Sequence, residues 1–72
     1  MESRLLKNLA ANLRSIRAQR SLSQDELAEV CGLHRTFIGG IERAERNITI
    51  STLEKIASSL DIDPIKLVDR KM

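Results

Sequence analysis

The stretch that decides the fold is QDELAEVCGLHRTFIGGIER, which runs from Gln24 to Arg43. Apolar residues recur at helical spacing on both sides of Gly32, which predicts two short helices joined by a tight turn. Gly32 suits the left-handed backbone conformation that ends a helix and redirects the chain. Two further glycines, Gly39 and Gly40, stand inside the second helix, where each is expected to cost about 1 kcal/mol relative to alanine. Their presence therefore needs a physical reason.

The start of the first of these helices is marked by the sequence LSQDEL, from Leu22 to Leu27. Ser23 can cap the helix, and Glu26, three residues later, can close a capping box. Leu22 and Leu27 occupy the two positions of a hydrophobic staple. The helix is predicted to continue to about Cys31.

A preceding helix is predicted over about Ser3 to Arg20, and the second helix of the central pair over His34 to Arg43. Both carry apolar residues at spacings of three and four. The preceding helix has a basic outer surface, and its expected buried stripe consists of Leu5, Leu6, Leu9, Leu13 and Ile16.

Two helices are predicted after the central pair. Ser51 is expected to cap the first of them, with Glu54 closing a capping box. Asp63 followed by Pro64 is typical of the cap and first residue of a short final helix. No segment shows the two-residue alternation of a half-buried strand. The sequence therefore predicts an all-α fold of five helices, in which residues 1–72 form a single domain.

The small size of the chain limits how it can be stabilised. A domain of 72 residues buries a modest core and often needs a disulfide, a metal or a partner chain. A single cysteine, Cys31, excludes an intrachain disulfide, and one histidine beside it makes a structural zinc site unfavourable. Self-association is therefore the expected additional support.

The charge balance does not identify a partner by itself, because a net charge of +2 is too small to indicate nucleic acid. Phe37 is the only aromatic residue, which argues against binding single strands by base stacking. Binding in the grooves of a duplex remains possible.

No apolar run is long enough to span a membrane, and the N-terminal MESRLLKNLA carries charges where a signal peptide needs an unbroken apolar segment. A cytoplasmic location is expected.

The two glycines can be placed on a helical wheel. At about 100° per residue, Ile38 and Ile41 point to one side of the helix, and the opposite side carries Arg35, Thr36, Gly39, Gly40 and Arg43. A face without side chains at its centre lets the backbone approach another surface closely, and the arginines can read a guanine edge or hold phosphates. The alternative is that the glycines cause a kink or an early helix end.

The run from Gln24 to Arg43 resembles the helix-turn-helix of the Cro/C1 type, the Xre family of the lambdoid phage repressors. The matching positions include the small Ala28 where the helices cross and Gly32 in the turn. The flanking helices match as well, from about Leu5 to Val68, which implies a lambda-repressor-like fold. Within the family, LHRTFIGGIERAERN, from Leu33 to Asn47, is most similar to the controller proteins of restriction-modification systems.

The resemblance implies a transcriptional regulator whose homodimer places two recognition helices in successive major grooves of a pseudo-palindromic operator, the arrangement for which phage repressors are the standard example. Arg35 and Thr36 match the positions that read bases. Gly39 and Gly40 depart from the phage repressors, many of which place a base-reading side chain there, so DNA shape is expected to contribute to specificity. The positions that match contacts to the DNA backbone are Gln24, Arg43, Arg46 and Asn47, of which Arg46 could also reach a base or the minor groove. Gly39 and Gly40 are expected to lie against the DNA backbone or groove.

Two further groups of residues have structural interpretations. By resemblance, Arg17 and Glu42 form an internal salt bridge between the first and third helices. The region from about residue 60 to 70 is more apolar than a short terminal helix needs, which predicts a twofold interface. Its candidates are Leu60, Ile62, Ile65 and Val68, although all four could instead close the core of the monomer.

No catalytic grouping is apparent. No histidine or cysteine has a plausible catalytic partner, and no glycine-rich phosphate loop precedes a helix. We therefore expect no enzymatic activity, no cofactor, no metal and no small-molecule ligand. The alternatives to an operator-binding controller are a phage-type repressor and an antitoxin or protein-interaction module, the last of which predicts an exposed apolar groove and weak DNA binding.

Overall fold

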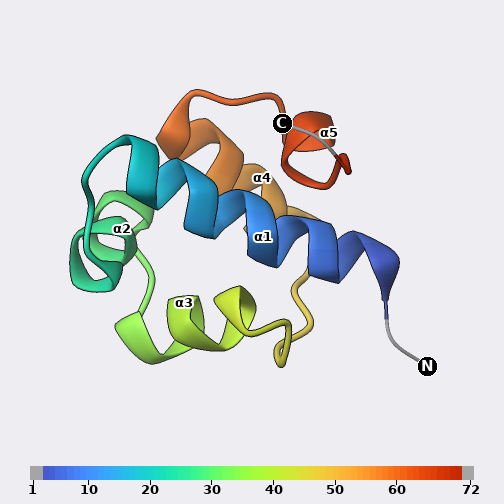
Figure 1. Cartoon of the computed structure of the whole chain (residues 1–72), viewed down its shortest axis with the longest axis horizontal. Coiled ribbons are helices and arrows are strands. Elements are labelled where there is room, and N and C mark those ends of the chain that lie inside the picture. The colour runs from blue at the N-terminus through green and yellow to red at the C-terminus, as the bar shows by residue number, and fades with distance from the viewer. Residues whose placement is uncertain (1–2, 71–72) are drawn as a thin grey trace.

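A computed structural model describes residues 3–70, and in this range the chain forms five α-helices and no strand (Figure 1). The expectation of an all-α fold with five helices is confirmed. Residues 1, 2, 71 and 72 of the expected domain lie outside the described residues. The helices are α1 (Arg4–Gln19), α2 (Gln24–Cys31), α3 (Arg35–Glu42), α4 (Ile50–Leu60) and α5 (Pro64–Leu67).

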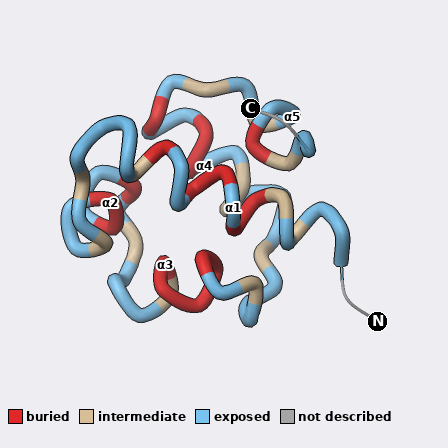
Figure 2. Tube along the Cα trace, in the orientation of Figure 1, coloured by how far each residue is buried: buried red, intermediate tan, exposed pale blue. Residues whose placement is uncertain are grey.

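The helices pack around one apolar core. The long α1 crosses the molecule and contacts both α3 and α5, whereas α2 packs against α3 and α4 (Figure 1). The buried segments of the helices face one another (Figure 2). Cys31 belongs to this core, where burial raises the pKa of its thiol. The large, fully buried aliphatic side chains are Leu9, Leu13, Ile16, Leu27, Ile38, Ile41, Ile56, Leu60 and Leu67.

The ends of α2 follow the sequence prediction. The Ser23 hydroxyl accepts a hydrogen bond from the Glu26 amide at 3.0 Å, and the Ser23 amide donates to the Glu26 carboxylate at 2.8 Å. Hydrogen bonding by the Ser23 amide, and then by the Ser23 hydroxyl, lowers the pKa of the Glu26 carboxyl. Gly32 ends the helix in the left-handed region, with φ of 64°. The capping box and the glycine turn are both confirmed.

The start of α4 was predicted wrongly. Thr49, rather than Ser51, caps the helix, because its hydroxyl accepts a hydrogen bond from the Thr52 amide at 3.0 Å. Ser51 already lies inside the first turn. Three hydroxyl residues occur in TIST, and the apolar periodicity does not distinguish among them. Asp63, by contrast, caps α5 as predicted, and its carboxylate accepts from the Ile65 amide at 2.9 Å.

The short helix α5 is held by amide side chains of α1. The Asn12 side chain is buried and donates to the carbonyl oxygens of Leu67 and Asp69, both at 2.8 Å. One turn earlier, the Asn8 side chain donates to the Val68 carbonyl at 3.0 Å. These contacts satisfy carbonyl groups that a helix end leaves without partners, so α5 is fixed although it has only four residues.

Two expectations about apolar residues need correction. Leu5, assigned to the buried stripe of the first helix, is 51% exposed. Leu60, assigned to a dimer interface, is 1% exposed and belongs to the core. Both errors have the same cause, since periodicity identifies the apolar face of a helix but not which neighbour covers each part of it. Within residues 3–70 no helix has the length and apolar character needed to cross a membrane.

Candidate nucleic-acid interface

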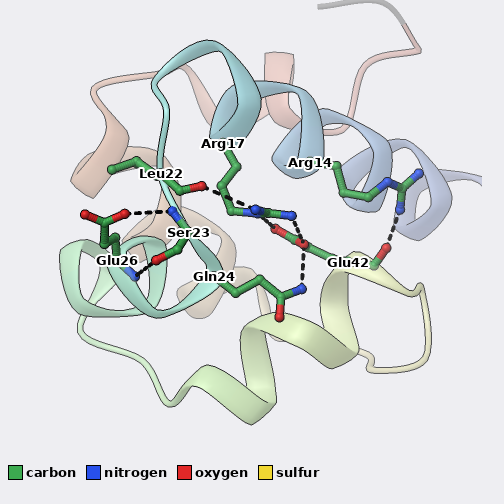
Figure 3. A network of polar contacts seen from close by, with 7 residues as sticks. All are labelled: Arg14, Arg17, Leu22, Ser23, Gln24, Glu26 and Glu42. Atoms are coloured by element: carbon green, nitrogen blue, oxygen red, sulfur yellow. Dashed lines mark hydrogen bonds and ion pairs between the residues drawn. The ribbon is translucent and has the colours of Figure 1, made fainter.

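The orientation of α3 depends on the buried carboxylate of Glu42 at its C-terminal end. Arg17 of α1 donates to both carboxylate oxygens, with Nε 2.8 Å from Oε2 and Nη2 3.1 Å from Oε1. The Gln24 side chain donates to the same Oε1 at 2.9 Å (Figure 3). The ion pair expected between Arg17 and Glu42 is therefore present, and it joins α1, α2 and α3.

Electrostatics and a second arginine reinforce this junction. The hydrogen bond to Glu42 raises the pKa of Arg17, although burial acts in the opposite direction. Arg14, three residues earlier on α1, donates to the backbone carbonyl of Glu42 (Figure 3). The last turn of α3 is thus bound through both its side chain and its backbone, so the exposed first turn has a defined direction.

The first turn of α3 presents the residues predicted to read bases. The His34 side chain caps the helix, and its Nδ1 accepts from the Thr36 amide at 3.1 Å. Arg35 and Thr36 follow directly, and both are exposed. The Arg35 guanidinium lies 3.2 Å from the Asp25 carboxylate, but both side chains are more than 60% exposed. Such a surface pair is weak, so Arg35 can exchange it for another acceptor.

The chain reverses sharply where α3 ends. The Ala44 amide donates to the Ile41 carbonyl and the Glu45 amide to the Gly40 carbonyl, both at 2.9 Å. This is the Schellman arrangement, and Ala44 occupies its left-handed position with φ of 58°. The chain therefore changes direction directly after the helix.

The two glycines of α3 lie beneath arginine side chains. Helix α3 continues through both to Glu42, so neither ends the helix early. A Cβ atom added at Gly39 would lie 3.1 Å from Nη1 of Arg43, and one at Gly40 only 2.5 Å from Cγ of Arg46. Both glycines are consequently buried. The expectation of an uncovered glycine face is wrong for the free chain, because the Arg43 side chain covers Gly39 and the Arg46 side chain, which follows the reversal, covers Gly40.

The structure brings most of the predicted contact residues together. One shallow hollow is lined by Gln24, Arg35, Thr36, Gly39 and Arg43. Arg43 also lines a second hollow, which is lined by Asn47 and Lys7 as well. Lys7 lies on α1 and was not among the predicted site residues, since no local pattern connects it to α3. Its position beside Arg43 and Asn47 results only from the packing of α1 against α3.

The fold and this surface define a helix-turn-helix protein, with α2, the Gly32 turn and α3 as the motif. The chain belongs to the helix-turn-helix family HTH_3, which matches residues 13–67. This is the Cro/C1-type family of DNA-binding transcriptional regulators, which are not enzymes, and the expectation of no catalytic activity is thereby confirmed.

Several individual proteins are similar to this chain over most of its length. The control protein C.SmaI of Serratia marcescens is 52% identical over 63 residues, which cover 88% of this chain and 75% of that protein. The structure of the restriction-modification controller protein C.AhdI from Aeromonas hydrophila matches with a TM-score of 0.79 and 40% identity, covering 86% of this chain and 94% of its own. The controller C.Esp1396I, solved as a tetramer with its natural 35 base-pair operator, matches with a TM-score of 0.79 and 36% identity, covering 93% and 97%.

Proposed function

We propose that this chain is a sequence-specific regulator that binds a pseudo-palindromic operator as a homodimer and controls the genes of a restriction-modification system. The observation that carries the proposal is the exposed first turn of α3, where Arg35 and Thr36 share one hollow with Gln24 and Arg43. Similarity to C.SmaI, C.AhdI and C.Esp1396I supports the assignment to restriction-modification control. Such a regulator acts on DNA in the cytoplasm.

Arg35 and Thr36 are the proposed base-reading residues. An arginine in the major groove can donate two hydrogen bonds to O6 and N7 of guanine, and threonine offers a methyl group to thymine and a hydroxyl to either partner. In the free chain Arg35 is paired with Asp25 on the surface. Binding therefore replaces a weak, solvated ion pair by a directional contact in the groove.

The remaining predicted residues are proposed to contact the DNA backbone, and among them Arg46 can also reach a base or the minor groove. Arg43, Arg46 and Asn47 are exposed around the end of α3. Gln24 begins α2, where backbone N–H groups can bind a phosphate. Its side-chain amide is already engaged by Glu42. We therefore assign phosphate binding at this position to the N-terminus of α2. The side-chain oxygen of Gln24 can also accept a hydrogen bond from a water molecule that bridges to the phosphate.

The proposed dimer uses an apolar face defined by Leu5, Ile50, Ile65 and Val68. Leu5, Ile50 and Ile65 are 51%, 73% and 72% exposed. Leu5 and Val68 line two adjoining hollows, one with Ile50 and the other with Ile65, so the four side chains are contiguous. Ile62, also predicted for the interface, is half-buried against the core and offers a partner only part of its side chain. Burying such a face supplies the support that a small core needs.

The same apolar face is the observation that favours the second candidate, an antitoxin or protein-interaction module. Ultracentrifugation addresses this choice. The homodimer predicts a dimer at tens of micromolar and a folded monomer for Ile65→Asp, because Ile65 contributes little to the core. A parent chain that is monomeric at that concentration contradicts the homodimer and favours a different protein partner.

The test of the proposed function is selection of bound duplexes from a randomised pool at near-physiological salt, because dilute buffer strengthens contacts that carry no sequence information. We expect enrichment of an inverted repeat, found upstream of restriction-modification genes in the genome that carries this chain. A repeat found only at a phage promoter would favour the phage-type repressor. Binding without enrichment that disappears as salt rises would reject sequence-specific regulation.

A further inference from the structure

Arg46 is seated against α3 although it lies beyond the end of that helix. Its guanidinium carbon is 5.7 Å from the centre of the Phe37 ring, which is within the range of a cation–π contact. The stem of the same side chain crosses Gly40, the next turn of the helix. Phe37 itself is half-buried against the core, so the ring provides a fixed surface.

The space at Gly40 is what admits this stem. A Cβ atom at Gly40 would lie 2.5 Å from Cγ, 3.5 Å from Cδ and 3.4 Å from Nε of Arg46. These are the inner atoms of the side chain, which cannot yield without changing its path. At Gly39 the corresponding neighbour is Nη1 of Arg43 at 3.1 Å, the mobile tip of its side chain. The two glycines therefore differ in what a methyl group would displace.

The path of the backbone leads Arg46 to this position. Left-handed Ala44 reverses the chain after α3, and the Glu45 amide is bound to the Gly40 carbonyl at 2.9 Å. Arg46 consequently returns over Gly40 toward Phe37. Since Phe37 directly follows Thr36, the guanidinium lies over the same turn of α3 that carries the proposed base-reading residues.

We propose that Gly40 and Phe37 form a seat that positions Arg46, and that this seat makes Arg46 a preorganised, specificity-determining part of the DNA-reading surface. The inference rests on the proposed function. Gly40 acts here through Arg46 and not by direct approach of its backbone to DNA. A side chain ordered before binding loses less conformational freedom on the operator, so loss of the seat weakens binding even though the guanidinium is still present.

A double-mutant cycle tests the reading role. Gly40→Ala is expected to lower affinity for the selected operator roughly three- to tenfold, whereas it has little further effect in an Arg46→Ala background. Its melting temperature should be equal to or higher than that of the parent, because alanine favours the helix. Gly39→Ala is the matched control. It is expected to change affinity for the operator by the same factor with and without Arg46→Ala. Independent effects of Gly40→Ala and Arg46→Ala would overturn the proposal.

Proton NMR of the free chain tests the seat without DNA. In the parent, the ring current of Phe37 should shift the Arg46 δ protons upfield, and both Gly40→Ala and Phe37→Leu should return them toward random-coil positions. Random-coil positions in the parent would overturn the seat. If the parent selects no operator, the proposed function fails and the reading role with it, but the NMR result still decides whether Arg46 is seated.

Discussion

Arg17 on α1 binds Glu42 at the end of α3, with Nε 2.8 Å from Oε2, and the Glu42 side chain is only 2% exposed. The orientation of the recognition helix thus depends on an ion pair between residues that are 25 positions apart in the chain. The partners have unequal access to water, because the Arg17 side chain retains 26% exposure. Removing the arginine is therefore more damaging than neutralising the carboxylate, because it leaves a buried charge without its partner.

The first prediction concerns this pair. Arg17→Met should lower the free energy of unfolding by about 3 kcal/mol, the lower end of the range for a broken buried pair, as measured by urea titration. Glu42→Gln should have a smaller effect, since the amide can still accept a hydrogen bond. Asp25→Asn is the control: it breaks the exposed pair with Arg35 and should change stability by less than about 1 kcal/mol. Equal losses for the buried and exposed pairs would contradict this account.

The capping box of α2 should make stability depend on pH. The Ser23 amide, and then its hydroxyl, keep the pKa of Glu26 below its ordinary value. The folded state therefore binds this proton less readily than the unfolded state, so the stabilisation is complete above the unfolded pKa and is lost as pH falls through the folded pKa. Glu26→Gln should lower the melting temperature most near neutral pH, and the difference should shrink in acid. A constant difference across this range would exclude the carboxylate as its source.

The left-handed turn at Ala44 contains removable strain. A non-glycine residue at positive φ is disfavoured by contact between its Cβ atom and the backbone. Ala44→Gly should therefore raise the free energy of unfolding by roughly 0.5–1 kcal/mol. The reciprocal change, Gly32→Ala, introduces the same strain at the turn between α2 and α3 and should lower it by about 1 kcal/mol. Chemical denaturation of the two variants should give shifts of opposite sign, and shifts of the same sign would refute the backbone explanation.

Asn12 should control the attachment of α5. Asn12→Ala leaves the carbonyls of Leu67 and Asp69 without their side-chain donor, and the expected loss is about 1–3 kcal/mol. Amide hydrogen exchange in α5 should accelerate more than exchange in α2. Because Ile65 and Val68 belong to the proposed dimer face, the dimer should also dissociate more readily. Asn8→Ala removes a single, half-buried hydrogen bond, and it should have the same effects at smaller magnitude; protection of α5 that survives Asn12→Ala would count against this anchoring role.

The proposed base and backbone contacts differ in their response to salt. Arg35→Ala should lower affinity by about 1–3 kcal/mol and relax the preference at one base pair. Arg43→Ala should weaken binding to all duplexes alike and reduce the slope of log K against log salt concentration by about 1. Titrations with the selected operator and a scrambled duplex at several salt concentrations separate the two. If both variants bind each duplex as the parent does, the interface has been assigned to the wrong surface.

Most features that depend on neighbours in sequence were predicted correctly. The capping box of Ser23 and Glu26, the turn at Gly32 and the start of α5 at Asp63 all involve groups within a few residues of one another. Even the cap of α4 failed only by choosing the wrong hydroxyl among adjacent candidates, Ser51 instead of Thr49. The exposed positions of Arg35 and Thr36 likewise follow from the periodicity of α3.

The covering of each surface was decided by tertiary structure. The sequence analysis placed Leu5 on the buried stripe of the first helix and Leu60 in a dimer interface, but packing exposed the first and buried the second. It placed both glycines of α3 away from the core, yet it did not indicate that Arg46 would lie over Gly40. That contact requires the reversal at Ala44, a residue whose type does not signal positive φ.

The sequence by itself determined the helices, most of their ends, the helix-turn-helix class and the residues of α3 that point outward. Only the tertiary structure decided that Glu42 joins three helices, that Asn12 anchors α5, and that Arg46 covers Gly40. The physical reason is the range of the interactions. Caps and helical periodicity arise from groups within one or two turns. The contacts of Glu42 and Asn12 join residues far apart in the chain and depend on how the helices cross, whereas the position of Arg46 depends on where the chain reverses after α3.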